Sequence, residues 1–159
     1  LSRQVSNFFV YGIFGVIACA VAGILFGWYV PTSIYTPVLF MIALILAVLV
    51  QFYLILSISL LAFFIYALWG VRGFIETLTF FFSGALIPLT MFPGWLSTIA
   101  SVLPFKYVLF VPLFIYLEQF TLQQSLMNIG MQIIFLIIFI MLSNFIYRKG
   151  LKKTDAQGG

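Results

Sequence analysis

Long apolar runs separated by short polar stretches dominate the chain. Four of them, residues 8–30, 38–69, 74–92 and 122–147, approach or exceed the roughly 20 residues that an α-helix needs to cross a bilayer. The second run is longer than a bilayer core requires, so we expect its helix to tilt or to extend beyond the membrane. The pattern predicts an all-α, polytopic membrane helix bundle with four spanning helices in a single transmembrane domain.

The segment between the third and fourth runs does not fit a simple span. Trp95, Ile99 and Val102 fall at helical spacing with serine and threonine residues on the opposite face, and Pro104 closes this stretch. The apolar run that follows is too short to cross a bilayer comfortably. We predict that 95–117 forms a re-entrant or interfacial pair of short helices, whose non-helical backbone is shielded by protein or faces water.

The last apolar run has a start signal of its own. Thr121 is followed three residues later by Gln124. At this spacing the two side chains can cap the first turn of a helix reciprocally. The sequence therefore predicts that the final spanning helix begins at about residue 122.

Composition favours a lipid environment and removes several kinds of chemistry. Hydrophobic residues make up 65% of the chain and charged residues 6%, whereas soluble domains have about 45–50% and about 25%. There is no histidine, and Cys19 is the only cysteine, which excludes histidine-based metal sites, Ser-His nucleophiles and an internal disulfide. No Walker-type phosphate loop is present. We expect no catalytic residue, no metal, no cofactor and no enzymatic activity of the chain itself.

Basic residues gather near the C-terminus. Of the seven lysines and arginines, Arg148, Lys149, Lys152 and Lys153 follow the last apolar run directly. Positive charge in that position marks the cytoplasmic end of a spanning helix. We therefore attribute the net charge of +4 to membrane orientation, exclude nucleic acid as a partner, and predict a cytoplasmic tail at 148–159.

The orientation of the other segments follows from that tail. We expect a multi-pass protein of the inner (plasma) membrane with its C-terminus in the cytoplasm. The last helix then starts on the outer side, so 95–117 lies outside. The same alternation places Arg72 and Arg3 inside. Lys106 is the one basic residue that disagrees, and it lies in the segment already singled out as unusual.

Two charged residues stand four apart near the start of the third run. Arg72 and Glu76 can pair on one face of a helix. A charge inside a bilayer costs on the order of 2.5–3.5 kcal/mol at a helix centre, and less near the interface. Two interpretations are open: an ion pair that sets the depth of the helix, or part of a cytoplasmic gate or of a contact for a coupling partner.

Lys106 and Glu118 flank the short apolar run on the outer side. One interpretation is that both side chains reach for the outer headgroups. The other is an outer gate or a surface for substrate release. Gln51 lies in the middle of the second run. At such a position a glutamine side chain more often makes a hydrogen bond to a neighbouring helix than it contacts a ligand.

Small residues recur every four positions in the first run. This face consists of Gly15, Cys19, Gly23 and Gly27. Small side chains at that spacing let another helix approach closely. We interpret the face as a helix-packing surface, with a sliding interface between subunits as the alternative.

Several apolar motifs punctuated by proline precede the basic tail. They are Phe82-Ser83-Gly84-Ala85-Leu86-Ile87-Pro88-Leu89, Phe92-Pro93-Gly94-Trp95-Leu96, Leu103-Pro104-Phe105, Pro112 and Tyr147-Arg148-Lys149-Gly150-Leu151-Lys152-Lys153, ending in Gly158-Gly159. With these motifs the chain resembles the C-terminal half of ABC transporter permeases of the type-2 (export-type) family. The chain begins with Leu1 and not with Met, so we expect a fragment of a longer protein.

The resemblance implies six spanning helices per subunit, of which the four predicted here are helices three to six. It implies short re-entrant helices on the outer side between the fifth and sixth. Two permease subunits, identical or different, form the pathway in membrane lipid, and two cytoplasmic ABC ATPase subunits drive it. A coupling helix for the ATPase normally precedes the third span, so we expect it upstream, apart from a remnant near Arg3.

Our hypothesis is therefore a permease subunit of an ATP-driven exporter, in which the outer re-entrant helices act as a lid. The candidate lid residues are Pro88, Pro93, Gly94, Trp95, Pro104, Lys106, Pro112 and Glu118. The main alternative is a structural or assembly subunit of a membrane complex without a substrate path. An intramembrane enzyme has few acids to use, and an ion channel has no visible filter signature. The sequence leaves the substrate and the direction of transport open.

Overall fold

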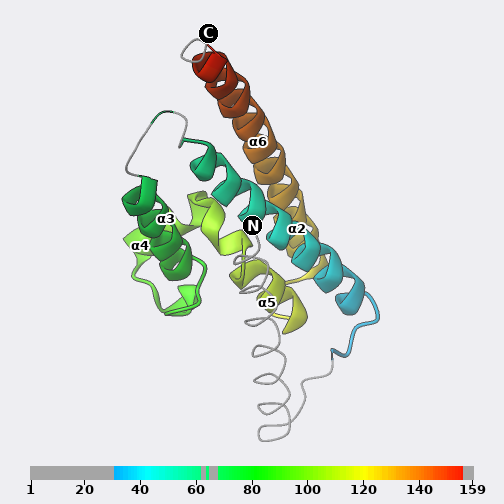
Figure 1. The fold of residues 1–159 in the computed structure, drawn as a ribbon. Helices are drawn as coiled ribbons and strands as arrows, with labels where there is room; N and C mark the ends of the chain where they lie inside the picture. Colours follow the sequence, from blue (N-terminus) through cyan, green and yellow to red (C-terminus); the bar gives the residue numbers. More distant parts are fainter. Residues whose placement is uncertain (1–30, 62–63, 65–67, 156–159) are drawn as a thin grey trace, which may run out of the picture. The chain divides into compact units, whose positions relative to one another are not determined.

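The structure is a computed structural model that describes residues 31–61, 64 and 68–155 (Figure 1). The chain divides into two compact units, 1–32 and 33–159, and every element described below belongs to the second. The predicted first span at 8–30 and its small-residue face of Gly15, Cys19, Gly23 and Gly27 lie outside the described residues.

The described part of the chain is helical throughout, which confirms the predicted all-α class, and no strand occurs in it. The elements in order are α2 (Thr36–Leu60), α3 (Leu68–Phe82), the 3-10 helix η2 (Leu89–Met91), α4 (Gly94–Val102), the 3-10 helix η3 (Pro104–Tyr107), α5 (Phe110–Tyr116) and α6 (Leu122–Asp155).

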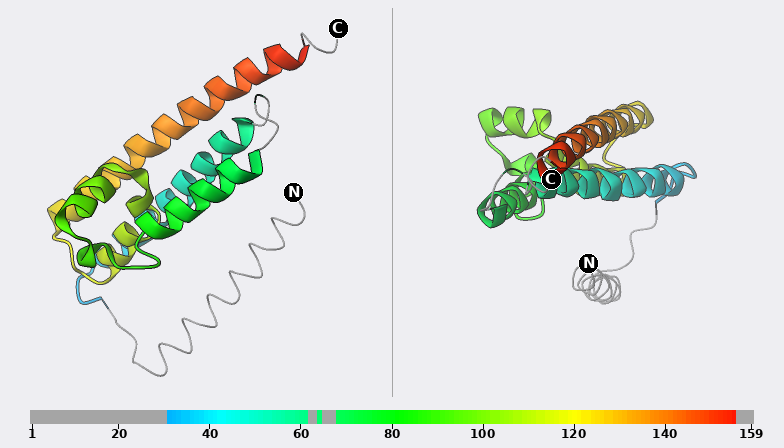
Figure 2. Two further views of the ribbon diagram at one scale, coloured as in Figure 1. Left: turned by 90° about the vertical axis from the view of Figure 1, so that its left-hand side faces the viewer. Right: turned by 45° about the horizontal axis from the view of Figure 1, so that its top comes forward.

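Two of these helices are long and apolar enough to cross a membrane. They are α2, over Thr36–Leu60, and the Leu122–Leu151 part of α6. They pack side by side and run in the same direction (Figure 2). Among the described residues, therefore, two helices have the length and composition of a span, and four spanning helices are not confirmed.

The boundary between the second and third runs is not where the sequence predicted it. The predicted run 38–69 ends early, because α2 stops at Leu60, and α3 already begins at Leu68. Residues 70–73, which separate the two predicted runs and include Gly70 and Gly73, lie inside α3. A glycine costs a helix only about 1 kcal/mol relative to alanine, which neighbouring residues with good helix propensity offset.

The third predicted run, 74–92, is also shorter as a helix than expected. The helix α3 ends at Phe82, and the chain then turns at Gly84, whose φ of 85° is in the left-handed region that favours glycine. Pro88 then precedes η2. With 15 residues, α3 is shorter than the roughly 20 that a full span requires.

The residues on the buried and exposed faces of α2 and α6 are those that a lipid environment requires. One face of α2 is buried at intervals of three and four residues, and it includes the small residues Ala43 and Ala47, which let α6 approach closely. Ser57 on this face donates a hydrogen bond of 3.3 Å from Oγ to the Phe139 carbonyl of α6. The exposed faces carry large aliphatic side chains such as Ile45 and Ile137, an arrangement that water would disfavour.

The start of α6 is the one that the sequence predicted. The Thr121 backbone N–H donates to Gln124 Oε1 at 3.0 Å, and the Gln124 N–H donates to Thr121 Oγ1 at 3.3 Å. This reciprocal pair is the predicted capping box. The helix then continues to Asp155, beyond the predicted end of the span at residue 147 and into the predicted tail.

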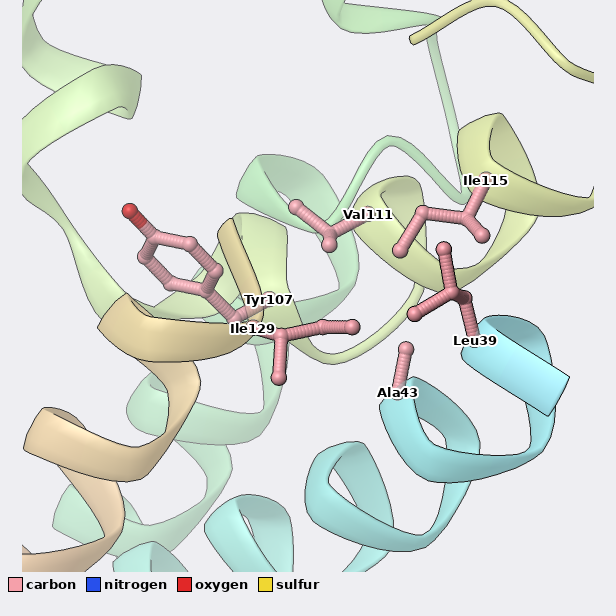
Figure 3. Close-up of a cluster of buried hydrophobic side chains, with 6 residues drawn as sticks. All are labelled: Leu39, Ala43, Tyr107, Val111, Ile115 and Ile129. Atoms are coloured by element: carbon pink, nitrogen blue, oxygen red, sulfur yellow. The ribbon is translucent and has the colours of Figure 1, made fainter. Parts of the chain in front are cut away.

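Between α3 and α6 the chain forms the two short helices that the sequence predicted, α4 and α5, with η3 between them. Pro93 precedes α4, and Pro104 opens η3, positions that proline tolerates because the first amides of a helix have no internal partner. The helix α5 packs on α2, where Val111 and Ile115 face Leu39 and Ala43 (Figure 3). The short-helix segment, residues 94–116, is therefore attached to the long helices by its C-terminal half.

Candidate functional site

The 3-10 helix η3 joins the short-helix segment to the helices around it. Its buried side chains point to different neighbours. The Phe105 ring stacks near Phe82 of α3, with centroids 6.3 Å apart, and the Tyr107 ring lies 5.3 Å from that of Phe135 on α6. η3 is thus held between the end of α3 and the middle of α6.

A single amide side chain ties η3 to both long helices. Gln132 of α6 has an exposed fraction of 0%. Its Nε2 donates one hydrogen bond to the carbonyl of Ala43 on α2, at 3.1 Å, and another to the carbonyl of Tyr107 on η3, at 2.9 Å. Its Oε1 is buried without a hydrogen-bond partner. This junction joins segments 89 and 25 residues away in the sequence.

The sequence pattern predicts an interhelical hydrogen bond for Gln51 and gives no such prediction for Gln132. The Oε1 of Gln51 is buried and has no partner, so that atom does not make the predicted bond. Gln132 makes bonds of the predicted kind. The available signal was an amide in the middle of an apolar spanning run, where a polar side chain is costly unless it finds a partner.

Glu118 anchors the start of a distant helix. Its Oε1 accepts a hydrogen bond from the Ser33 backbone N–H at 2.8 Å and another from the Thr36 hydroxyl at 3.0 Å. Ser33 precedes α2 and Thr36 is its first residue, so the carboxylate fixes the entry into α2 from the turn before α6, and its charge complements the positive end of the helix dipole. Neither sequence interpretation of Glu118, headgroup contact or outer gate, included this role.

Lys106 lies beside the junction with its side chain half-buried. Its Nζ is 4.9 Å from the centroid of the Tyr107 ring, within the range of a cation–π interaction. Burial lowers the pKa of Lys106 below its ordinary value, because desolvation disfavours the charged form. The structure therefore places this cation against an aromatic face and not in open solvent.

The predicted pair of Arg72 and Glu76 is formed. Arg72 Nε donates to Glu76 Oε1 at 2.8 Å, and both side chains are well exposed on α3. Ten residues separate Arg72 from Phe82, a distance of about 15 Å along a helix. The pair therefore belongs to the opposite end of α3 from the aromatic contact with η3.

The remaining candidate lid residues are distributed along the short-helix segment and the turn before it. Pro88 and Pro93 are the residues before η2 and α4, Gly94 is the first residue of α4, Pro104 is the first residue of η3, and Pro112 is buried in α5. Trp95 is 68% exposed. These residues shape the turns of the segment, and the structure does not gather them into one cluster of side chains.

The described residues contain no group of His, Cys, Asp and Glu side chains that could hold a metal ion. Their arrangement is that of a polytopic helical membrane protein: two apolar helices side by side, with a short-helix segment packed against them. The family model described as ABC-2 family transporter protein matches residues 4–158. The chain belongs to this family, as the resemblance of its proline-punctuated motifs indicated.

Comparison with curated proteins and comparison with solved structures each found no match to the chain. The family assignment therefore rests on the family model alone.

Proposed function

We propose that the chain is a membrane permease subunit of an ATP-driven ABC exporter, which lines the substrate pathway together with a second permease subunit. The observation that carries this proposal is the match of the ABC-2 transporter family model to residues 4–158. The exposed aliphatic faces of α2 and α6 support it, because they are suited to lipid contact.

We propose that the protein lies in the inner membrane of the cell. In the proposed orientation the C-terminal end of α6 faces the cytoplasm. Arg148 and Lys149 on the last turns of α6 support this orientation through the positive-inside rule. Since α2 and α6 run in the same direction, both then begin on the outer side. The short-helix segment and the contact of Glu118 with Ser33 and Thr36 lie at that outer end.

The short-helix segment is the part that we propose acts as the outer lid. Its backbone is interrupted by turns between α4, η3 and α5, and such backbone at membrane depth has to be covered by protein or face water. The buried junction at Gln132 supplies protein cover for part of it. At the other end of α3, the exposed Arg72–Glu76 pair is the proposed cytoplasmic gate or contact for the coupling partner.

ATP hydrolysis is proposed to reside in separate ATPase subunits. The sequence has no Walker-type loop and no histidine, so the chain itself is proposed to be no enzyme and to need no cofactor. Closure of the ATPase pair on ATP would then be transmitted to the permease subunits and open a path between them.

The test uses the full-length protein, purified from membranes together with candidate ATPase subunits and reconstituted in lipid. ATP hydrolysis is measured with and without the permease. A stable complex whose hydrolysis depends on the permease supports the proposal. Failure to recover any ATPase across several mild detergents would instead favour a structural subunit of a membrane complex without a substrate path.

A further inference from the structure

Interactions of two different kinds hold η3 in place. On the side of α2 and α6, Gln132 donates two hydrogen bonds, of which one goes to the Tyr107 carbonyl of η3. On the side of α3 the contacts are aromatic: Phe105 stacks near Phe82 with centroids 6.3 Å apart. The η3 helix is therefore bonded on one side and stacked on the other.

These two kinds of contact resist motion differently. A hydrogen bond weakens steeply once its angle falls below about 120°, and in a membrane interior no water replaces it. A stacked or tilted aromatic pair is favourable over centroid distances of about 4.5–7 Å. A sliding motion of about 1–2 Å parallel to the ring faces therefore strains the Gln132 bonds, whereas the Phe82 and Phe105 centroids, 6.3 Å apart, stay within about 7 Å of each other.

Two further attachments lie on the same side as Gln132. Glu118, two residues after α5, accepts hydrogen bonds from Ser33 and Thr36 at the start of α2. Val111 and Ile115 of α5 are buried in the cluster that also contains residues of α2 and α6 (Figure 3). The η3–α5 part of the short-helix segment is thus attached to α2 and α6 at three places.

Further contacts between aromatic rings lie at the end of α3. The rings of Phe81 and Phe92 stack with centroids 5.4 Å apart, and Phe82 meets Phe92 edge-on at 6.3 Å. Together with the Phe82–Phe105 stack, these rings form an aromatic interface between the end of α3 and the residues that follow it. We name the four residues Phe81, Phe82, Phe92 and Phe105 the phenylalanine interface.

The unused acceptor of Gln132 shows that stability alone does not explain this residue. Its Oε1 is buried without a partner, and a buried polar atom in that state carries a desolvation penalty that an apolar side chain of similar size avoids. What the amide supplies, and an apolar side chain cannot, is a fixed geometry between α6, Ala43 and Tyr107. Buried polar groups are best attested in such a registering role.

We propose that Gln132 is a positioning residue that locks η3 and α5 to α2 and α6, so that these elements move as one body. Within the phenylalanine interface, the Phe82–Phe105 stack is then the contact at which the end of α3 slides relative to that body. This inference rests on the proposed function only where it assigns the sliding to the transport cycle. The locking itself is a property of the chain alone.

The experiment is hydrogen–deuterium exchange on the full-length protein in lipid nanodiscs, with the variant Gln132→Met. Methionine has a similar length and volume and removes both hydrogen bonds. We expect the amides of residues 105–109, including that of Val108, to exchange about threefold faster, the change given by the one intramembrane hydrogen bond of typical strength that ends on η3. Exchange in α3 should not change.

The matched control is Gln123→Met, the same substitution at an exposed position of the same helix. It should leave exchange at 105–109 unchanged. A second variant, Phe82→Leu, loosens the phenylalanine interface, so it should speed exchange at 83–92 and leave Val108 protected. The proposal is overturned if Gln132→Met leaves exchange at 105–109 unchanged, raises it equally in every helix, or does no more than Phe82→Leu.

The unsubstituted protein gives an independent test, which applies even if Gln132→Met does not assemble. Under increasing denaturant, residues 105–109 should lose protection together with α2, after residues 83–92 have lost theirs. Loss of 105–109 together with 83–92 contradicts the proposal. Neither measurement requires an ATPase or a substrate, so failure of the transporter assignment would be seen separately, in the co-purification experiment.

Discussion

The carboxylate of Glu118 accepts a hydrogen bond of 3.0 Å from the hydroxyl of Thr36, which lies 82 residues earlier in the chain. The same oxygen accepts the Ser33 backbone N–H. The turn between α5 and α6 is therefore bonded to the start of α2, which places the N-terminal ends of the two long helices at the same end of the bundle (Figure 1).

Removal of this long-range contact should destabilise the protein. We expect Glu118→Ala to lower the free energy of unfolding by about 1–3 kcal/mol, because the Ser33 N–H and the Thr36 hydroxyl lose their charged acceptor. Glu118→Gln should cost less, because an amide oxygen still accepts the bonds of Ser33 and Thr36. Unfolding in detergent, followed by circular dichroism, measures the difference. The control is Glu76→Gln, which removes an exposed carboxylate, and equal losses for Glu118→Gln and Glu118→Ala would contradict the anchoring role.

The Arg72–Glu76 pair should matter more for coupling than for stability. As an exposed pair four residues apart on a helix, it is worth only about 0.3–0.5 kcal/mol. We expect Arg72→Gln and Glu76→Gln to leave the unfolding transition nearly unchanged and to reduce permease-dependent ATP hydrolysis severalfold. The exchanged pair, Arg72→Glu with Glu76→Arg, should restore the ion pair.

Hydrolysis in the exchanged pair distinguishes the two interpretations of this site. If the ion pair itself is what coupling needs, the exchanged variant recovers activity. If one of the charges contacts the ATPase directly, activity stays low although the pair has re-formed. Full activity in both single variants would leave the pair as an anchor of helix depth and remove it from the coupling path.

Close packing of α2 against α6 should be intolerant of larger side chains. Ala43 has an exposed fraction of 0%, so Ala43→Leu would force the helices apart at a cost of typically 1–3 kcal/mol. It would also displace the carbonyl that Gln132 bonds. Val48→Leu, at a position 53% exposed on the same helix, is the control and should be neutral. Thermal stability of the two purified variants in detergent decides the matter, and equal stability would contradict the packing.

Restraint of the phenylalanine interface should stop transport if the short-helix segment is a lid. Cysteines at 82 and 105, whose native rings stack with centroids 6.3 Å apart, can be joined by a short, reducible thiol-specific crosslinker in a Cys19→Ser background. We expect crosslinking to abolish export and reductant to restore it. Each single-cysteine variant, treated in the same way, is the control. Unchanged export after quantitative crosslinking would rule out a moving segment at this interface.

Several features could be read from the sequence because they depend on residues three or four positions apart. The Thr121–Gln124 capping box and the Arg72–Glu76 pair are of this kind, since one turn of helix brings their side chains together whatever the rest of the chain does. The apolar runs that became α2 and α6 are similar, because their length and composition alone favour a bilayer.

Other features were decided only by tertiary structure. The acceptors of Gln132 are 89 and 25 residues away in the chain, and the donors to Glu118 are 85 and 82 residues away. The spacing of residues along the chain therefore predicts neither set of hydrogen bonds. The same holds for the end of α2 at Leu60, which the predicted run 38–69 placed too late. The length and composition of the apolar runs were enough to indicate a membrane protein, and the prolines and the short last-but-one run were enough to indicate short helices before the final span, because each of these signals is local. Which polar side chain meets which carbonyl is a property of the packed helices, because it depends on distances that exist only once they have assembled.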